Sequence, residues 1–459
     1  MGAIITLSIL ALLVLYLGLF KANKALLPVS IVGLLVVVGL LVRDWTVEAN
    51  PLYNGMILFD HYAIAFSVLC TVVTILVLVL SKGYFTSSSD HVAEYYTLLL
   101  FSLLGAVLVN SYHNLALLFL GIEIMSVALY ILVGIRKKDL ASNEAALKYF
   151  IMGAFSTGFL LFGITLLYGA SGSFDLEEIK HYVVDHPDQV SPLFYGGVLL
   201  MMIGLIFKVG AAPFHFWTAD VYDGAPILIT SFMSTVVKIA SFAGLLRLFT
   251  FSLLPLQDFW TPIFLGVVVL TLFIGNLSAL MQSSFKRMLV YSSISHAGYL
   301  LFAVVAAGPD SANAVFVYGA AYSLATLTAF AGLILVKRTI GSDHFESFNG
   351  LAKKNPYLAA VMTIAMLSLA GIPLTAGFIG KFMMFSAVME QYHIVLLLIA
   401  VLNAAIAVYY YLKVVVAMYF RTGEDKPVAI NANYVFLFVV TTVLTILIGV
   451  YPNYLMQLI

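Results

Sequence analysis

Charged residues are scarce in this chain, and no stretch of ordinary soluble composition stands between its apolar segments. Only 10% of the 459 residues are charged, whereas 63% are hydrophobic and the mean hydropathy is +1.07. A soluble domain of ordinary composition carries about 25% charged residues. The composition therefore excludes a soluble globular protein.

Cysteine is nearly missing as well. The single Cys70 lies inside an apolar segment, so the chain has no cysteine pair for a disulfide or an iron–sulfur site. Paired Cys/His spacings, glycine-rich nucleotide loops and haem-attachment motifs are also missing from the sequence. We therefore expect no metal, cofactor or redox centre in this chain. The net charge of zero, without a basic tract, gives no sign of nucleic-acid binding.

Long apolar runs are the dominant feature that remains. A transmembrane helix needs about 20 mostly apolar residues, and fourteen segments come near or exceed that length. They cover residues 2–20, 27–43, 63–80, 94–109, 113–134, 144–168, 193–219, 225–250, 257–281, 285–305, 311–336, 356–388, 393–420 and 432–451. The pattern predicts an all-α integral membrane protein with about fourteen transmembrane helices.

Basic residues are distributed unevenly between alternate connections. Connections after even-numbered segments hold only Arg43, Lys180 and Arg247. Connections after odd-numbered segments hold fourteen: Lys21, Lys24, Lys82, Arg136, Lys137, Lys138, Lys286, Arg287, Lys337, Arg338, Lys353, Lys354, Arg421 and Lys426. Basic loops stay on the cytoplasmic side, so we expect both termini on the outer side of the membrane.

Ionisable side chains nevertheless interrupt the apolar segments. They are Glu123, Lys148, Lys208, Lys238, Lys381 and Lys413. A charge at the centre of a bilayer costs about 2.5–3.5 kcal/mol on insertion scales, which packing alone would not justify several times over. His296 adds a group that titrates near neutral pH. Together these residues predict a path for protons or ions.

Glycine and proline break up two segments beside a lysine. One break is expected at Pro213, close to Lys208, and the other at Pro373, close to Lys381. Proline removes a backbone donor and clashes with the preceding turn, so the helix should open there. Open backbone inside a membrane is tolerated only where it is buried or lines a wet cavity. Paired broken helices indicate a transport site in a repeated fold.

The two breaks correspond if segments four to eight form one unit and segments nine to thirteen another. Five is an odd number, so the second unit must be inverted relative to the first. Glu123 then matches His296, and Lys238 matches Lys413. The predicted domains are three helices in 1–90, a first five-helix repeat in 91–252, a second, inverted repeat in 253–425, and a final helix in 426–459.

A buried lysine beside a carboxylate can switch between holding and releasing a proton when the carboxylate moves. Glu123 and Lys208 are the expected pair, because Glu123 is the only acidic residue expected at mid-depth. Lys238 and His296 would be the next stations. Lys381 would release the proton on the outer side.

Structural interpretations stand beside these roles. Glu123 and Lys208 could form a static ion pair, and His296 could be a buried hydrogen-bonding side chain. His215 is expected to fill the break at Pro213 and to play no part in transfer.

Lys148 and Lys413 are secondary candidates, together with Glu144. Lys148 lies one turn after Glu144 near the end of its segment, which also suits an i,i+4 ion pair. Lys413 lies eight residues before Arg421 and could extend to the inner surface. We favour that structural interpretation of Lys413 over a role in transfer.

Residues 212–226, Ala-Pro-Phe-His-Phe-Trp-Thr-Ala-Asp-Val-Tyr-Asp-Gly-Ala-Pro, resemble the signature of the antiporter-like subunits of respiratory complex I. Residues 117–123, 284–296 and 371–381 support the resemblance, which extends over nearly the whole chain. The subunit N branch fits best, because Lys381 stands where subunit M carries a glutamate. No long lateral helix follows the last segment, as it does in subunit L.

The resemblance implies a non-redox, proton-translocating subunit in the membrane arm of NADH–quinone oxidoreductase, located in a bacterial inner membrane. FMN, iron–sulfur clusters and quinone would belong to partner subunits. The partners would be other membrane-arm chains, including further antiporter-like subunits and small membrane subunits. By position in the family motif, proton transfer would involve Glu123, Lys208, Lys238, His296 and Lys381.

Two departures and three other functions stand beside this resemblance. Ala219 and Leu374 occupy positions where the family usually has proline, which affects only the expected kink geometry. A subunit of an Mrp-type sodium/proton antiporter, or of a membrane-bound hydrogenase complex, would share the same lysines. A solute permease would instead need a mid-membrane pocket for an organic ligand, whereas a spaced line of titratable groups suits protons.

Overall fold

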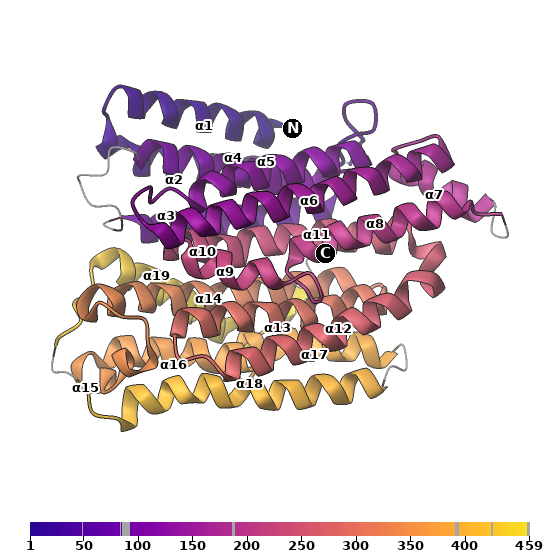
Figure 1. Cartoon of the computed structure of the whole chain (residues 1–459). Coiled ribbons are helices and arrows are strands. Elements are labelled where there is room, and N and C mark those ends of the chain that lie inside the picture. The colour runs from indigo at the N-terminus through magenta and orange to yellow at the C-terminus, as the bar shows by residue number, and fades with distance from the viewer. Residues whose placement is uncertain are drawn as a thin grey trace.

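The computed structural model describes residues 1–47, 49–82, 84, 92–185, 189–390, 394–423 and 426–456. Helices dominate these ranges, where β pairing is limited to isolated bridges. Most helices lie roughly side by side, with the first helices at one edge of the bundle and α18 at the other (Figure 1). Thirteen helices in this part of the chain are long and apolar enough to cross a membrane. The predicted all-α membrane fold is confirmed.

The chain begins with three helices: α1 (Gly2–Leu19), α2 (Asn23–Asp44) and α3 (His61–Ser81). α3 begins where the Asp60 carboxylate accepts a hydrogen bond from the Ala63 amide at 2.8 Å, as N-caps do. The same carboxylate forms a 2.6 Å ion pair with Arg247, which lies in the span 227–252.

The next part of the chain runs from α4 to η3. Its elements are α4 (Val92–Ser111), α5 (Leu115–Val133), α6 (Leu140–Ser171), α7 (Leu176–Asp185), α8 (Pro192–Val209), α9 (Phe216–Gly224), α10 (Ile227–Phe232), η1 (Met233–Val237), α11 (Lys238–Arg247), η2 (Leu248–Ser252) and η3 (Leu254–Leu256). Both η1 and η2 are π-helical turns inside one continuous span. Short π-helical turns of this kind are frequent at functional sites.

The remaining part runs from α12 to α20. Its elements are α12 (Gln257–Leu280), α13 (Phe285–Ala306), α14 (Ser311–Ile340), η4 (Phe345–Phe348), α15 (Leu351–Lys354), α16 (Pro356–Ala370), α17 (Ala376–Glu390), α18 (Ile394–Phe420), α19 (Ala432–Val450) and α20 (Asn453–Met456). The expected segment 356–388 consists of two shorter helices, α16 and α17. The count of fourteen, the inverted repeats and the domain limits stay predictions, and the limit at 90/91 lies outside the described residues.

Both helix breaks occur at the predicted prolines. α8 ends at Val209 and is capped by Gly210, whose φ of 72° is left-handed; Pro213 lies in the stretch before α9 begins. α16 is likewise capped by Gly371, with φ of 83°, and Pro373 precedes α17. Glycine adopts this conformation without the steric cost that a side chain would bring. Each span is therefore divided into two half-helices.

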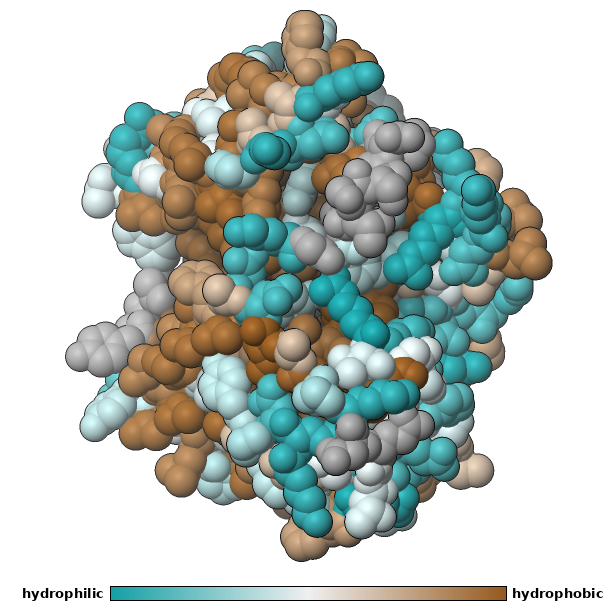
Figure 2. All heavy atoms as spheres, turned by 90° about the vertical axis from the view of Figure 1, so that its left-hand side faces the viewer, coloured by the Kyte–Doolittle hydropathy of each residue, from teal (hydrophilic) through white to brown (hydrophobic). Residues whose placement is uncertain are grey.

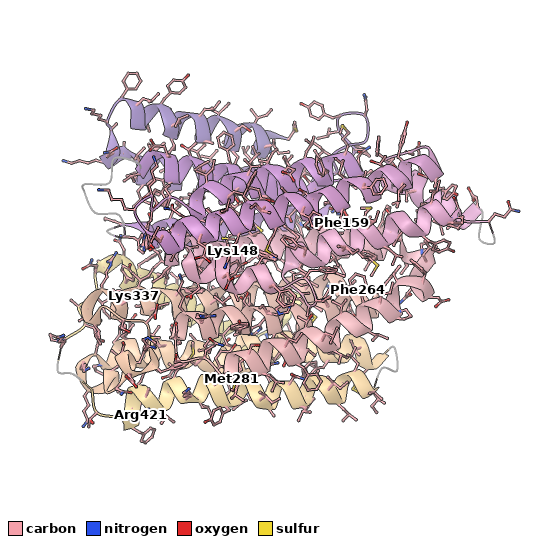
Figure 3. All side chains as sticks on the ribbon, in the orientation of Figure 1. Lys148, Phe159, Phe264, Met281, Lys337 and Arg421 are labelled. Carbon is pink, nitrogen blue, oxygen red and sulfur yellow. The ribbon has the colours of Figure 1, made fainter. Side chains whose placement is uncertain are left out.

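The centre of the bundle is formed by the span 227–252 together with α13 and α14, which are almost entirely buried. α1, α2 and α19 have few fully buried residues and expose many apolar side chains, as lipid-facing helices do. Hydrophilic residues gather at the end of the bundle that Figure 2 views. Lys337 and Arg421 lie toward this end, whereas Phe159 and Phe264 lie nearer the middle (Figure 3).

Candidate functional site

Lys208 lies in the last turn of α8, directly before the first break, and is 8% exposed. Its Nζ donates a hydrogen bond to Ser126 Oγ at 2.6 Å, and Ser126 donates to the Ile122 carbonyl. Glu123, on the same helix as Ser126, lies within electrostatic reach of Lys208 but forms no ion pair with it at 4.0 Å or less. Its buried Oε1 has no hydrogen-bond partner among the described residues. This geometry differs from a static ion pair.

Lys238 is the first residue of α11 and follows the π-helical turn η1. Its buried Nζ donates to the Ser293 backbone carbonyl at 2.5 Å and to Ser293 Oγ at 2.7 Å. Ser293 belongs to α13, so Lys238 connects the two predicted repeats through a hydrogen bond.

His296 lies three residues after Ser293 on α13 and is also buried. Its Nδ1 lies 2.6 Å from the Tyr318 hydroxyl of α14, and its Nε2 lies 3.0 Å from the Tyr411 hydroxyl of α18. Three helices thus meet at this imidazole, and both of its nitrogens are hydrogen-bonded.

Lys381 lies on α17, just beyond the second break. Its buried Nζ donates to the carbonyls of Leu369 at 3.1 Å and Ala370 at 2.9 Å, at the end of α16. The carboxyl end of a helix carries partial negative charge, which favours a cation there. The ammonium also lies over the ring of Tyr299, with Nζ 5.0 Å from the ring centroid.

Lys286 is a further buried lysine. Its predicted position in a connecting loop is wrong. It lies in the first turn of α13 and is only 3% exposed. Its Nζ donates to the carbonyl of Asp223 and, at 2.7 Å, to that of Ala225, at the end of α9. Arg287 follows with its Nε 3.7 Å from the Asp223 carboxylate. The N-cap residue Ser284 is the sequence signal that places Lys286 inside a helix.

The secondary candidates lie outside this buried set. Lys148 forms 2.7 Å ion pairs with both Glu144 and Asp220, and it is 41% exposed beside a polar pocket of about 190 Å³. Figure 3 labels it on α6. The ion pair with Glu144 has the predicted i,i+4 spacing.

The Nζ of Lys413 lies over the ring of Phe345, 4.5 Å from its centroid.

Trp217, which the sequence analysis did not single out, closes the first break. Its Nε1 donates to the Phe207 carbonyl at 3.1 Å, and its ring stacks on those of Phe207 and Tyr149. His215 is buried next to it, against Phe216, and its Nδ1 has no hydrogen-bond partner in the described part of the chain.

An apolar pocket of about 490 Å³ also adjoins this break, lined by side chains of α6, α8 and the residues after Pro213. No group of three or more His, Cys, Asp or Glu side chains in the described ranges could hold a metal ion.

Known proteins are similar to this chain in sequence and fold. The family model for the transmembrane part of NADH:quinone oxidoreductase and Mrp antiporters matches residues 113–407. NADH-quinone oxidoreductase subunit N from Cytophaga hutchinsonii is 39% identical, over 100% of this chain and 99% of its own length. This chain belongs to the NADH-quinone oxidoreductase subunit N family. The resemblance in the sequence is thereby confirmed.

Solved structures agree with membership of the subunit N family. Respiratory complex I from Thermus thermophilus with bound aureothin contains a chain that is 32% identical, with a TM-score of 0.85, over 99% of this chain and 98% of that one. A chain of the Mrp complex from Dietzia has the same TM-score at 17% identity, covering 100% and 95%. At that identity the Mrp chain shows a shared fold alone. The Mrp alternative is therefore less supported than subunit N.

Proposed function

We propose that this chain is a non-redox, proton-translocating subunit in the membrane arm of a bacterial NADH–quinone oxidoreductase. One observation carries the proposal: Lys208, Lys238, His296 and Lys381 are all buried in the bundle, and all are hydrogen-bonded. Redox chemistry in partner subunits would supply the energy. FMN, iron–sulfur clusters and quinone would be bound by those partners, which include further antiporter-like and small membrane subunits.

The unpaired carboxylate of Glu123 gives a physical means of driving Lys208. Two unit charges interact by about 4 kcal/mol at 4 Å with an effective dielectric constant of 20, and by about half of that at twice the distance. A displacement of Glu123 by a few ångströms would thus change the energy of a charged Lys208 by about 2 kcal/mol. Ser126, a neutral acceptor, holds the amine without fixing its charge.

The remaining groups would continue the path. Lys238 would receive the proton on the first repeat and pass it across its hydrogen bond with Ser293 to α13. His296 would relay it, and Lys381, at the second break, would release it toward the periplasm. Both termini would then face the periplasm in the inner membrane.

An Mrp-type antiporter or a membrane-bound hydrogenase arm would contain the same buried line, so the companion chains decide between them. Purification of the native complex, followed by identification of its subunits, tests this directly. Flavin and iron–sulfur chains support the proposal, whereas a set of small antiporter subunits contradicts it.

The proton role is tested by Lys208→Ala in the assembled complex. We expect assembly to be retained, while NADH-driven quinone reduction and proton pumping fall together by about tenfold or more, as for loss of a proton-transfer group. Lys353→Ala, which removes an exposed lysine of α15, is the matched control and should pump normally. Normal pumping by an assembled Lys208→Ala complex would remove Lys208 from the mechanism.

A further inference from the structure

The imidazole of His296 lies between two tyrosine hydroxyls that reach it from different helices. The Tyr318 hydroxyl lies 2.6 Å from Nδ1, and the Tyr411 hydroxyl lies 3.0 Å from Nε2. We propose that Tyr318 and Tyr411 are proton-relay residues, so that a proton passes His296 through a hydroxyl–imidazole–hydroxyl bridge. This inference rests on the proposed function and names the groups that carry the proton through the second half of the chain.

The hydrogen-bonding capacity of the three groups supports such a bridge. A neutral imidazole has one N–H donor and one acceptor nitrogen, and each hydroxyl can both donate and accept. One tyrosine therefore donates to the ring while the other accepts from it, and the direction of the whole bridge can reverse. All three side chains are at most 3% exposed, so the hydroxyls take the place that water would have around an exposed histidine.

Two adjacent serines of α13 contact one tyrosine of the bridge and Lys238. The Tyr411 hydroxyl is also hydrogen-bonded to Ser292 Oγ, one turn before His296 on α13. Ser293, the next residue, accepts the hydrogen bond of the Lys238 ammonium at its own Oγ. Tyr411 and Lys238 thus contact neighbouring serine residues of α13.

The opposite end of the bridge lies beside the helix of Lys381. A Cβ built on Gly380 would lie 2.7 Å from Cδ2 of the Tyr318 ring, so only glycine allows α17 to approach this closely. Gly380 directly precedes Lys381. Tyr318 therefore packs directly against the residue that precedes Lys381.

The transfer step balances as follows. A proton that reaches Tyr411 Oη from the Ser292 side displaces the phenol proton onto Nε2 of His296. The Nδ1–H bond breaks as Tyr318 Oη accepts that proton, and Tyr318 gives its own hydroxyl proton to the next acceptor toward Lys381. One proton has moved, no electrons are exchanged, and the imidazole is left in its other tautomer. A flip of the ring and rotation of the two hydroxyls restore the starting state.

The proposal is tested with Tyr411→Phe and Tyr318→Phe in the complete complex. Each change keeps the aromatic ring and removes only the hydroxyl. We expect NADH-driven proton pumping to fall by about tenfold or more in both variants. The solvent deuterium isotope effect should rise above the wild-type value, because proton transfer becomes slower than the other steps. A defect of packing alone would lower activity without changing the isotope effect.

Tyr434→Phe is the matched control. Tyr434 is a fully buried tyrosine of α19 whose hydroxyl has no hydrogen-bond partner among the described residues. The Tyr434→Phe complex should pump normally. Ser292→Ala provides a variant that leaves both aromatic rings in place, and it decides the question if a tyrosine variant does not assemble. We expect it to slow pumping at least threefold.

Pumping above one third of wild type in Tyr318→Phe, Tyr411→Phe and Ser292→Ala, or an unchanged isotope effect, would overturn the bridge. Lys238→Ala, measured beside them, separates this outcome from failure of the proposed function. If Lys238→Ala stops pumping and the tyrosine variants do not, the line of buried groups stands and the bridge is wrong. If Lys238→Ala also pumps normally, the proposed function itself fails.

Discussion

Gly371 offers a way to displace Lys381 without removing its charge. Gly371 ends α16 with φ of 83°, and a Cβ built there would lie 2.7 Å from Cδ of Lys381. Ordinary van der Waals contacts of a Cβ begin at 3.4 Å. In Gly371→Ala the flexible lysine stem must therefore retreat by about 0.7 Å, the difference between these two distances, away from the backbone that its ammonium contacts.

The expected destabilisation of Gly371→Ala has two contributions. The ammonium of Lys381 now donates to carbonyls at 3.1 and 2.9 Å, and the retreat takes the longer bond beyond hydrogen-bonding range. A hydrogen bond to a charged group contributes about 1.5–3 kcal/mol. Holding alanine in the left-handed conformation costs about 1–2 kcal/mol more. We expect a total destabilisation of about 2.5–5 kcal/mol in Gly371→Ala, with Lys381 no longer held at the end of α16.

Gly341→Ala separates the two contributions. Gly341 follows α14 with φ of 88°, and its Cβ would have no atom within 4 Å. It carries the same backbone cost without touching Lys381. The assay is NADH-driven proton pumping by the purified complex in liposomes, together with its thermal inactivation temperature. Gly341→Ala should pump normally and inactivate at a slightly lower temperature, whereas Gly371→Ala should lose most of its pumping. Equal pumping by both variants would refute this reasoning.

Three further outcomes are expected. Glu123→Gln should lower pumping in liposomes more than Glu123→Asp, because charge and not shape acts on Lys208; equal losses would favour a static ion pair. Lys286→Met should destabilise the complex by about 1–3 kcal/mol, because the carbonyls at the end of α9 lose a buried donor. Lys286→Arg should restore part of the lost stability. An unchanged melting temperature of the Lys286→Met complex would contradict this prediction. Lys148→Ala should reduce pumping less than Lys208→Ala, because the Lys148 side chain is 41% exposed and lies outside the buried set. An equal loss in the same assay would add Lys148 to the path.

Features that depend on local sequence were predicted well. The spans follow from the length of each apolar run, because a lipid-facing helix must satisfy all its backbone hydrogen bonds within itself. The breaks at Pro213 and Pro373 follow from the missing donor of proline and from the glycine beside each one. The short helix α7 was not expected, because its ten residues have too few apolar side chains to resemble a span.

Features that depend on distant contacts were not predicted. Lys286 resembles an ordinary basic loop residue at the end of a segment, and only the fold brings the end of α9 over it. The chain contains 26 tyrosines, and membrane proteins place many of them at the lipid interface. Nothing in the local sequence separates Tyr318 and Tyr411 from the others. Their significance comes from α14 and α18 meeting at His296.

The buried lysines share one property that the sequence did not reveal. Among the described residues, Lys208 donates to a serine hydroxyl, Lys238 to a serine hydroxyl and a carbonyl, and Lys286 and Lys381 to carbonyls at the ends of half-helices. A carboxylate in contact would hold an ammonium in its charged form. A neutral oxygen accepts a hydrogen bond from an ammonium and from an uncharged amine alike.

Neutral hydrogen-bond acceptors of this kind suit proton transfer by a buried amine. An amine that keeps its hydrogen bond in both charge states need not move far to take up or release a proton, and the amine itself keeps a partner in either state. The helix breaks supply such acceptors, because they expose backbone carbonyls that an intact helix would use internally. In this chain Gly371 and Pro373, which separate α16 from α17, therefore free the backbone carbonyls that bind the Lys381 ammonium. The same reasoning predicts that closing the second break, by any substitution that makes α16 and α17 continuous, will stop pumping even with every lysine in place.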